Sequence, residues 1–283
     1  MVSNLTSVDN STKEDSFGRF VGISSDGRVI AFNHQTSDAF VDVGAVNIYQ
    51  EINGTWIQMG NRLYGSEKHA YFGWAIALSK SGYRIAVSSL GGNQNPGKVD
   101  MYDYNGTSWE RVGSNPIEER TLDEYNFGAF IDLSGDGSVV AASAPANNNG
   151  TVRAYRYNEE IEEWLAYRNE LQGENMQDGF GNSLALSHDG NTLAISGPQN
   201  RNFCDYCGHI KVYRNTNGTW DIIGSELGLT GIDGGKFGSA LALSASGSRL
   251  VGGAPSTIFN GFVSQVGQVV VFDSVINDTT SGM

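Results

Sequence analysis

The chain has 283 residues, of which 31 are acidic and 18 are basic, so its formal net charge at pH 7 is −13. This charge argues against nucleic acids and anionic membranes as partners, because neutralising phosphate groups needs lysine and arginine. No apolar run approaches the roughly 18 residues of a membrane-spanning helix. The first residues, MVSNLTSVDNSTKEDS, lack the apolar stretch of a signal peptide. Glycine is abundant at 37 residues and proline scarce at 5, which suits a chain with many tight turns.

The chain consists of a unit that occurs five times. Each unit begins with a Phe-Gly pair, and successive pairs lie 55, 55, 53 and 57 residues apart. Nine residues after each phenylalanine comes an Asp-Gly or Ser-Gly pair. The phenylalanines are Phe17, Phe72, Phe127, Phe180 and Phe237, and the first four units also contain Trp56, Trp109, Trp164 and Trp220 at one recurring position. A fixed period of this size indicates a repeat architecture.

The fourth unit shows the pattern most clearly. Residues 180–198 read FGNSLALSHDGNTLAISGP. Leu184 and Leu186, and then Leu193 and Ile195, alternate with small or polar residues. Alternation with a period of two is typical of strands that turn one face to a core, so this segment predicts two strands.

The turns within each unit carry residues that tolerate positive φ. Asp189-Gly190 lies between the two alternating runs and predicts a type I′ hairpin turn, with φ > 0 at both central residues. The segment HIKVYRNTNGTWDII that follows predicts a second hairpin, which turns at Asn217-Gly218. Four strands per unit, repeated five times, predict an all-β propeller with five blades of four antiparallel strands.

We expect a single propeller domain over residues 1–283, with blades that begin near residues 17, 72, 127, 180 and 237. Residues 1–16 align without a gap to the segments that precede the other Phe-Gly pairs. The last unit stops after its third strand, at Phe272. The first segment is therefore expected to supply the missing fourth strand of the last blade and to close the ring.

One segment carries two competing signals. Residues 158–173, NEEIEEWLAYRNELQG, place Ile161, Trp164, Leu165 and Leu171 at roughly helical spacing. However, Trp164 falls in register with the tryptophans that open the fourth strand of the other units. Because the repeat outweighs local propensity, which is a weak signal by itself, we predict a strand.

The repeat resembles the FG-GAP repeats of integrin α-chain propellers, which also occur in secreted or surface proteins of microbes and algae. The resemblance covers residues 17–272 and is carried by FG-x-[AS]-[IL]-A-L-S, by G-x-V-x-V-Y and by a Gly-Ala-Pro element that is intact at residues 253–255. The first two units lack the Gly-Ala-Pro element. The resemblance implies a β-propeller. Since the integrin ring has seven blades, a fragment of a longer ring remains an alternative to a closed five-bladed one.

Members of this family that bind calcium carry a D-x-D-x-D-G loop between the first two strands of a blade. Ca²⁺ needs several converging oxygen ligands. Four of the five turns here are reduced to S-S-D-G, S-K-S-G, S-H-D-G and S-A-S-G. Only the third turn keeps a partial pattern, from Asp132 to Asp136, and no acidic residue follows to complete it. We therefore expect a polar hairpin tip here, and no metal or cofactor.

The long connections, between the second and third strands and between blades, must emerge on the face opposite the tight turns. Variable loops on a rigid scaffold are where binding sites usually lie. Their aromatic rings and amides suit a neutral sugar or a peptide strand. The candidate ligand-binding residues are Phe40, Asn93, Asn148, Phe203, Tyr206, Phe259 and Phe262. The alternative is that the asparagines serve loop conformation and the rings fold back onto the blades.

Cys204 and Cys207 are the only cysteines of the chain. A zinc site needs four nitrogen or sulfur ligands, and only His209 lies close in sequence. Gly208 interrupts the C-x-x-C-H pattern of haem attachment, and a thioredoxin-type pair would need a helix start that this fold lacks. A disulfide that closes one loop is the favoured interpretation, and it indicates an oxidising compartment.

Seven N-x-[ST] sequons occur in the chain. Three of them lie in Asn-Gly-Thr hairpin turns, which turn chemistry explains without a glycan. The other four, at Asn4, Asn10, Asn149 and Asn277, are glycosylation candidates. Together with the cysteines and the acidic charge, they predict an extracellular or cell-surface location.

No H-E-x-x-H, G-x-S-x-G or G-x-G-x-x-G motif is present, and we assign no catalytic residue. The four histidines, His34, His69, His188 and His209, fall in predicted loops or turns, so we interpret them as solvated. These features favour a non-enzymatic propeller for binding or adhesion, with a glycan or a protein as its partner.

Two other hypotheses remain open. A polysaccharide hydrolase or lyase would place carboxylates near the ring axis, and Asp38, Asp42, Asp178 and Asp233 fall in loops of the appropriate face. A hydrolase needs two carboxyl groups roughly 5–9.5 Å apart. Alternatively, the chain is a structural module of a larger wall or matrix protein, in which case neither a binding patch nor a carboxyl pair is expected.

Overall fold

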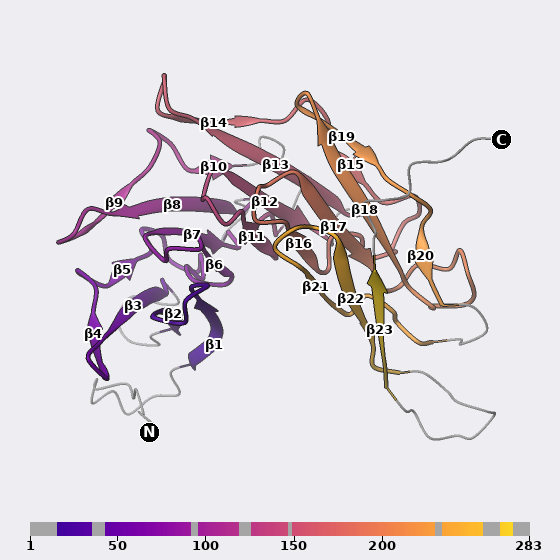
Figure 1. Cartoon of the computed structure of the whole chain (residues 1–283), viewed down its shortest axis with the longest axis horizontal. Helices are drawn as coiled ribbons and strands as arrows, with labels where there is room; N and C mark the ends of the chain where they lie inside the picture. The colour runs from indigo at the N-terminus through magenta and orange to yellow at the C-terminus, as the bar shows by residue number, and fades with distance from the viewer. Residues whose placement is uncertain are drawn as a thin grey trace.

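The computed structural model describes residues 16–35, 43–91, 96–118, 126–146, 149–229, 234–256 and 267–273. These residues form 23 strands in five antiparallel sheets, and no helix occurs among them. The sheets follow one another along an arc as the blades of a propeller (Figure 1). The predicted all-β fold with five blades is confirmed.

The strands follow one another along the chain, blade by blade. Blade 1 contains β1 (Ser16–Ile23), β2 (Val29–Gln35), β3 (Ala45–Ile52), β4 (Thr55–Gln58) and β5 (Leu63–Tyr64). Blade 2 contains β6 (Ile76–Leu78), β7 (Arg84–Ser89), β8 (Lys98–Tyr104), β9 (Trp109–Arg111) and β10 (Ile117–Glu118). Blade 3 contains β11 (Ile131–Leu133), β12 (Val139–Ala144), β13 (Thr151–Asn158), β14 (Glu163–Ala166) and β15 (Leu171–Gln172). Blade 4 contains β16 (Leu184–Leu186), β17 (Thr192–Gly197), β18 (His209–Thr216), β19 (Thr219–Ile222) and β20 (Leu227–Gly228). Blade 5 contains β21 (Ala240–Leu243), β22 (Arg249–Ala254) and β23 (Gln268–Asp273).

The outermost strand of each of the first four blades is interrupted. In blade 4 the order is β16-β17-β18-β19, and β20 pairs with the other end of β18. The expected fourth strand is thus two short segments on one partner. The same division in blade 3 gives β14 and β15, so residues 158–173 contain strands and no helix, as the repeat predicted.

The hydrophobic core lies between the blades. We call the face of a blade that packs on the following blade its front face, and the opposite face its rear face. Alternating residues of one strand serve the two faces, since Val139 and Ala141 of β12 pack on blade 4 while Val140 and Ala142 pack on blade 2. The front face of blade 3 comprises Val139, Ala141, Val152, Ala154 and Leu171, and it meets Phe180, Leu184, Leu186, Leu193, Ile195, Tyr213 and Trp220 of the rear face of blade 4. Both faces of an inner blade are therefore buried against its neighbours and excluded from solvent.

The phenylalanine of a Phe-Gly pair anchors each described junction. Phe180 is fully buried, and its carbonyl oxygen lies against Gly150, which precedes the third strand of blade 3. Gly150 has φ +79°, and a Cβ added there would lie 2.2 Å from that oxygen. Only glycine fits both the backbone conformation and the close approach. The other three junctions repeat the contact in the pairs Gly44 and Phe72, Gly97 and Phe127, and Gly208 and Phe237.

The turn at Asp189-Gly190 is not the predicted type I′ turn. Gly190 has φ +65°, but Asp189 does not have a positive φ. Instead the Ser187 hydroxyl donates a 2.5 Å hydrogen bond to the Asp189 carboxylate. This hydrogen bond stabilises a wider loop in which Gly190, and not Asp189, has a left-handed backbone conformation. At Asn217 and Gly218 φ is +53° and +87°, as a type I′ turn requires.

The turns between the first and second strands are also joined from blade to blade. Ser25 N donates to Lys80 O (3.1 Å), Lys80 N to Gly135 O (2.8 Å), Gly135 N to His188 O (2.9 Å) and His188 N to Ala245 O (2.8 Å). All five residues occupy the same position of the repeat. This ladder of backbone hydrogen bonds fixes the spacing of the hairpins independently of the apolar core.

Two of the four histidines are not solvated as predicted. His34 on β2 and His209 on β18 have no exposed surface. The prediction was wrong because it treated these positions as loop, whereas both lie at strand ends that the neighbouring segments cover.

The predicted closing strand, residues 1–16, lies outside the described residues except for Ser16, where β1 begins. Blade 5 accordingly has three described strands. In the part of the chain that the structure describes, no helix has the length and apolar character needed to cross a membrane.

We predict that Phe180→Ala lowers the free energy of unfolding by about 3–5 kcal/mol, because it removes a fully buried ring and leaves a cavity at a blade junction. Equilibrium unfolding in urea measures this change. Ile222→Ala is the matched control, since Ile222 is about half exposed on β19 and its truncation should cost less than about 0.5 kcal/mol. Equal losses in the two variants would contradict the role given to the phenylalanine.

Candidate functional site

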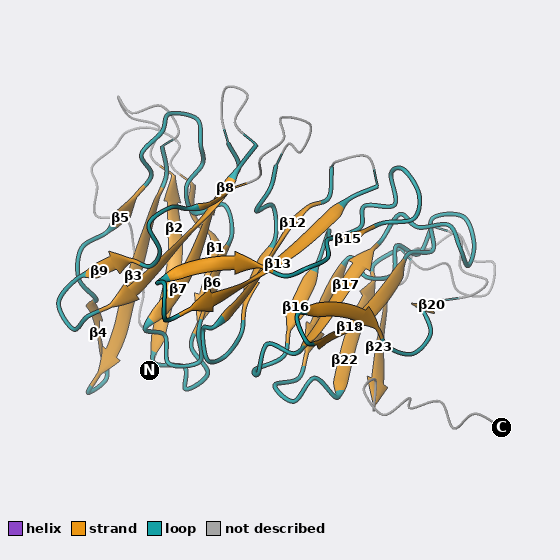
Figure 2. Cartoon of the chain, turned by 90° about the horizontal axis from the view of Figure 1, so that it is seen from above, coloured by secondary structure: helices purple, strands orange, loops and turns teal. Residues whose placement is uncertain are grey.

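The strands end in short turns at one edge of the blades and in longer loops at the opposite edge (Figure 2). The sequence places candidate ligand-binding residues in these longer loops. Phe203 and Tyr206 are described, and both lie in the loop of residues 198–208, between β17 and β18 of blade 4. The remaining candidates, Phe40, Asn93, Asn148, Phe259 and Phe262, lie outside the described residues. The 198–208 loop is therefore the candidate site.

A disulfide closes the tip of this loop. Cys204 and Cys207 are bonded, as predicted, with their Cα atoms 5.3 Å apart. At the base of the loop, Gly208 N donates to Asn200 O (3.0 Å), and Phe237 N from the start of blade 5 donates to Cys207 O (2.7 Å). The loop is thus held at its tip by a covalent bond and at its base by two blades.

Tyr206 is the exposed aromatic residue of the loop tip. The residue retains 38% of its possible exposure, and its φ is +56°. The Arg201 guanidinium lies over the ring, 3.9 Å from the centroid, and Arg201 Nε also pairs with Asp205 at 3.3 Å. Lys236 N donates to Tyr206 O (3.0 Å). The tip therefore presents a cation, a carboxylate and a phenol ring on a backbone that is held in place.

Phe203 lies differently from Tyr206. It is half-buried and packs on Gly228 of β20, where an added Cβ would come within 2.1 Å of the Phe203 ring. The absence of a side chain at Gly228 makes room for the ring. Phe203 thus rests on its own blade, and Tyr206 is the ring of this loop that solvent reaches more freely.

A group of charged and amide side chains lies beside the loop, and we call it the polar cluster: Glu174, Asn202, His209, Lys211 and Glu226. Asn202 Nδ2 lies 2.9 Å from Glu174 Oε2 and 3.2 Å from Glu226 Oε2, so one amide bridges two carboxylates. Lys211 Nζ pairs with Glu174, and His209 Nδ1 contacts Glu226. Hydrogen bonds from Lys211 and Asn202 hold the pKa of Glu174 below its ordinary value, so this carboxylate is ionised at neutral pH.

His209 is the buried member of the polar cluster. Burial, together with the neighbouring Lys211, lowers its pKa to about 4. The Asp178 and Glu174 carboxylates act in the opposite direction, but burial prevails, and His209 Nε2 finds no acceptor among the described residues. The imidazole is therefore neutral at physiological pH, and its Nδ1–H donates to Glu226.

Asp178, one of the carboxylates considered for a polysaccharide-cleaving enzyme, holds two loops together. It is buried, and its Oδ2 accepts hydrogen bonds from Asn200 Nδ2 (2.8 Å) and Asn175 N (3.1 Å). The other three carboxylates considered, Asp38, Asp42 and Asp233, lie outside the described residues. The hydrogen bonds of Asp178 thus give this buried carboxylate a structural role that requires no substrate.

Of the glycosylation candidates, Asn149 is described and is half-buried just before β13. Its carbonyl oxygen lies against Gly173, where an added Cβ would come within 2.0 Å. Asn4, Asn10 and Asn277 lie outside the described residues.

The two carboxylates of the partial calcium pattern point to different partners. Asp132 Oδ2 accepts from Leu186 N of blade 4 (2.7 Å), and its Oδ1 accepts from Leu133 N (2.8 Å). Asp136 Oδ1 accepts from the Ser134 hydroxyl (2.6 Å) and from Ser138 N (2.9 Å). Their oxygens bind N–H and O–H donors instead of converging. No group of three or more His, Cys, Asp or Glu side chains suited to a metal ion is found in the described residues.

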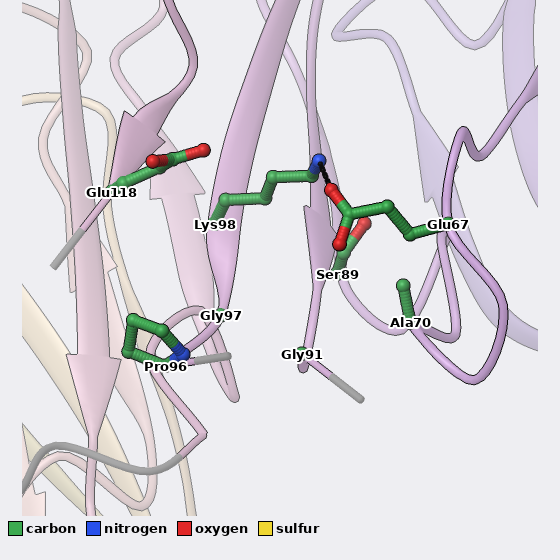
Figure 3. A pocket seen from close by; sticks show the side chains of 8 residues that line it. All are labelled: Glu67, Ala70, Ser89, Gly91, Pro96, Gly97, Lys98 and Glu118. Atoms are coloured by element: carbon green, nitrogen blue, oxygen red, sulfur yellow. Dashed lines mark hydrogen bonds and ion pairs between the residues drawn. The ribbon is translucent and has the colours of Figure 1, made fainter. Parts of the chain in front are cut away.

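A small cavity lies at the loop edge of blade 2 (Figure 3). Lys98 reaches across it to Glu67 with a 2.6 Å ion pair, and Ser89, Glu118 and Gly97 are among the other residues that line it. Its volume is about 60 Å³, which accommodates a few water molecules but neither a sugar ring nor an aromatic side chain. We therefore do not regard it as the ligand site.

Sequence reasoning missed Arg201, Glu174 and Glu226 as members of this region. Glu174 and Glu226 come from connections that lie before and after the loop in the chain, and only the blade geometry brings them to Asn202. Their shared feature, a position just beside a short outer strand segment, repeats in Glu170 of blade 3, which pairs with Arg153. A comparison of charged residues at equivalent positions of the repeat could have indicated these acidic side chains.

Comparison with known proteins supports the fold. Neither the protein-family models nor the curated proteins provide a match to this chain. Solved structures do, including the β-propeller domain of the Trilobed protease from Pyrococcus furiosus, with 10% identity, a TM-score of 0.53 and coverage of 93% of this chain and 72% of that one. Pyrococcus horikoshii acylaminoacyl peptidase matches with 13% identity, a TM-score of 0.52 and coverage of 93% and 38%.

A 6-phosphogluconolactonase candidate from Bacteroides uniformis matches with 16% identity and a TM-score of 0.50. The match covers 75% of this chain and 55% of that one, so the chain spans little more than half of its length. At these identities the similarity shows a shared propeller fold and nothing of the function.

We predict that Asp132→Asn removes a pH dependence from folding. Burial raises the pKa of Asp132 to about 6, although the Leu186 and Leu133 amides act against burial. The folded chain therefore holds this proton more tightly than the unfolded chain, whose carboxyl titrates near 3.8. The stabilisation that results is fully present below that value and is lost as the pH rises through about 6. Asp132→Asn should gain stability relative to the parent chain between pH 4 and 7, as measured by urea midpoints.

Asp136→Asn is the control of opposite sign for Asp132→Asn. Burial opposes ionisation of Asp136, but hydrogen bonds from Ser134 and Ser138 outweigh it and hold the pKa below its ordinary value. Asp136 therefore stabilises the fold at neutral pH and loses that contribution in acid. Identical pH profiles for the two variants would contradict the assignment.

We predict that the Cys204→Ser and Cys207→Ser double variant loosens the loop tip while the blades stay folded. The disulfide closes a loop of only residues 204–207, so its entropic contribution to global stability is about 2 kcal/mol. Hydrogen exchange should accelerate at the Gly208 amide and remain unchanged at strand β17. Unchanged exchange at Gly208 would show that its hydrogen bond to Asn200 does not depend on the disulfide.

Proposed function

We propose that this chain is a non-enzymatic binding propeller that recognises a glycan or a protein segment through the 198–208 loop of blade 4. The observation that carries the proposal is the exposed Tyr206 ring on a tip held by the Cys204–Cys207 disulfide. A ring whose backbone is fixed before binding loses little conformational entropy when a ligand stacks on it. Preorganised aromatic rings of this kind are common at binding surfaces.

The groups around Tyr206 define the class of ligand. Arg201, Asp205 and the Tyr206 hydroxyl offer donors and acceptors within the same loop, as hydroxyl-rich sugars and peptide backbones require. The net charge of −13 and the carboxylates of the polar cluster disfavour phosphorylated or sulfated ligands. A neutral glycan or a peptide with basic residues therefore fits this surface best.

An enzymatic function is the second candidate, because Asn202 holds the carboxyl groups of Glu174 and Glu226 close together. The retaining and inverting mechanisms of sugar hydrolysis both need one carboxylic acid that stays protonated. Glu174 cannot be that acid, since Lys211 and Asn202 stabilise its ionised form, and the other carboxyl group, Glu226, is engaged as the acceptor of His209 Nδ1. The ion pairs of the polar cluster thus favour a binding role over an acid–base pair.

We also propose kinship with the FG-GAP propellers and an extracellular or cell-surface location. Supporting the kinship, the phenylalanine and the glycine that define the repeat form the blade junctions, where a family signature has a physical reason to persist. Supporting the location, a structural disulfide persists in oxidising compartments. Adhesion is the role that such a location and a rigid binding loop suggest, and a module of a wall or matrix protein is the alternative.

We predict that Tyr206→Ala reduces binding by about 5- to 30-fold in a glycan-array or peptide-array screen of the chain, because stacking on the ring and its Arg201 partner, worth about 1–2 kcal/mol, is lost. Phe203→Leu is the matched control, since this ring packs on Gly228 and should affect binding little. The screen is repeated with chelator. Binding that survives Tyr206→Ala would place the ligand elsewhere, and a blank screen would favour the structural module.

A further inference from the structure

The front face of blade 5 lacks the cover that every other front face has. Val269 is 70% exposed and Val271 is 56% exposed. Both lie on β23, the third strand of the blade. The residues at the position of Val269 in the other blades, all 0% exposed, are Val46, Val99, Val152 and Ile210, and those at the position of Val271, all at most 3% exposed, are Ile48, Met101, Ala154 and Val212. Among the described residues, blade 5 thus presents a junction surface that no other blade covers.

The rear face of blade 1 is open in the same way. Val21 is 70% exposed and Ile23 is 65% exposed, both on the inner strand β1. In blade 4 the equivalent residues Leu184 and Leu186 are 9% and 7% exposed against blade 3. In the described residues, no strand of blade 1 packs on a strand of blade 5, and the two blades form the ends of an arc (Figure 1).

The polar parts of a junction are also present at the two ends. In blade 2, Arg84 pairs with Asp103 on the front face at 2.6 Å, lies 4.9 Å from the Tyr157 ring centroid of blade 3 and donates to Gly137 O at 3.0 Å. Its ring partners at that junction also include Trp164.

Blade 5 carries the equivalent pair, Arg249 with Asp273, largely exposed on its front face. Blade 1 carries Gly27 and Trp56 at the positions of Gly137 and Trp164, and Glu51 at the position of Tyr157. If Arg249 packed on the rear face of blade 1 in the way that Arg84 packs on blade 3, it would therefore lie beside the Glu51 carboxylate and the Trp56 ring.

The ladder of backbone hydrogen bonds between the turns also indicates a further junction. Each turn donates its amide to the carbonyl of the following blade, and among the described residues the series stops when Ala245 O accepts from His188. The next step would take Ala245 N to a carbonyl such as that of Ser25, which begins the series in blade 1. Hydrogen-bonding groups at both ends are thus set for one more junction of the same kind.

We propose that a second copy of this chain covers these surfaces, with the front face of blade 5 of one copy packed on the rear face of blade 1 of the next. The two faces are complementary because the same positions mate at all four internal junctions. Contact within one chain would require the four packed junctions to rotate, since the end blades are held apart along the arc. Such a contact is heterologous, so each added copy leaves one front face and one rear face open, and association proceeds head to tail.

Sedimentation velocity of the full chain over a range of concentrations, in physiological salt, tests the proposal. We expect species larger than the 30.4 kDa monomer that increase with concentration. Val269→Asp blocks the front face and Ile23→Asp blocks the rear face. Each variant alone should be monomeric, with association weakened by about 100-fold or more, because every contact needs one intact face of each kind.

Mixing the two variants gives the decisive result. One intact front face and one intact rear face remain in the mixture, so we expect a one-to-one dimer and nothing larger. Ile222→Asp, on the exposed side of β19, is the control and should associate like the parent chain. A parent chain that is monomeric at every concentration, or a mixture that stays monomeric while both variants remain folded by circular dichroism, would overturn the proposal.

Discussion

Every described junction depends on one close contact, in which the carbonyl oxygen of a phenylalanine lies against the glycine that opens the third strand of the preceding blade. At Gly150 the approach leaves no room for a Cβ, and the phenylalanine side chain fills the dry space beside it. The two most recognisable features of the repeat, Phe-Gly and Gly-x-Val, are therefore two sides of one interface. Because that interface joins consecutive blades, its recurrence explains why the period of the sequence is the period of the fold.

Much of this architecture could be predicted from the sequence, since a repeat multiplies a weak local signal. The alternation of Leu184, Leu186, Leu193 and Ile195 indicates strands, and the register of Trp164 correctly outweighs the helical spacing around it. Other features depended on three-dimensional context. The Asp189 turn was predicted wrongly because the Ser187 hydroxyl supplies a hydrogen bond that the Asp-Gly pair alone does not reveal.

The candidate site was predictable only in part. The disulfide and the two aromatic residues of the 198–208 loop follow from spacing and residue type. The bridge from Asn202 to Glu174 and Glu226 does not, because its members are separated by 28 and 24 residues and meet only when the outer strand segments are placed. Burial of His209 escaped prediction for a related reason: a histidine at a strand end is solvated or dry according to what the neighbouring loops cover.

The attachment of the disulfide loop has a mechanical consequence. The Cys207 carbonyl accepts a hydrogen bond from Phe237 N, and Gly208 lies against the carbonyl oxygen of Phe237. The 198–208 loop, which carries Tyr206, is therefore anchored at the junction between blades 4 and 5, and not only within blade 4. A force applied to the loop therefore acts first on this junction. Beyond the junction lies blade 5, whose front face is uncovered among the described residues. Stiffening the loop therefore also stabilises the packing of the last blade, and this couples the ligand binding proposed above to the stability of that blade.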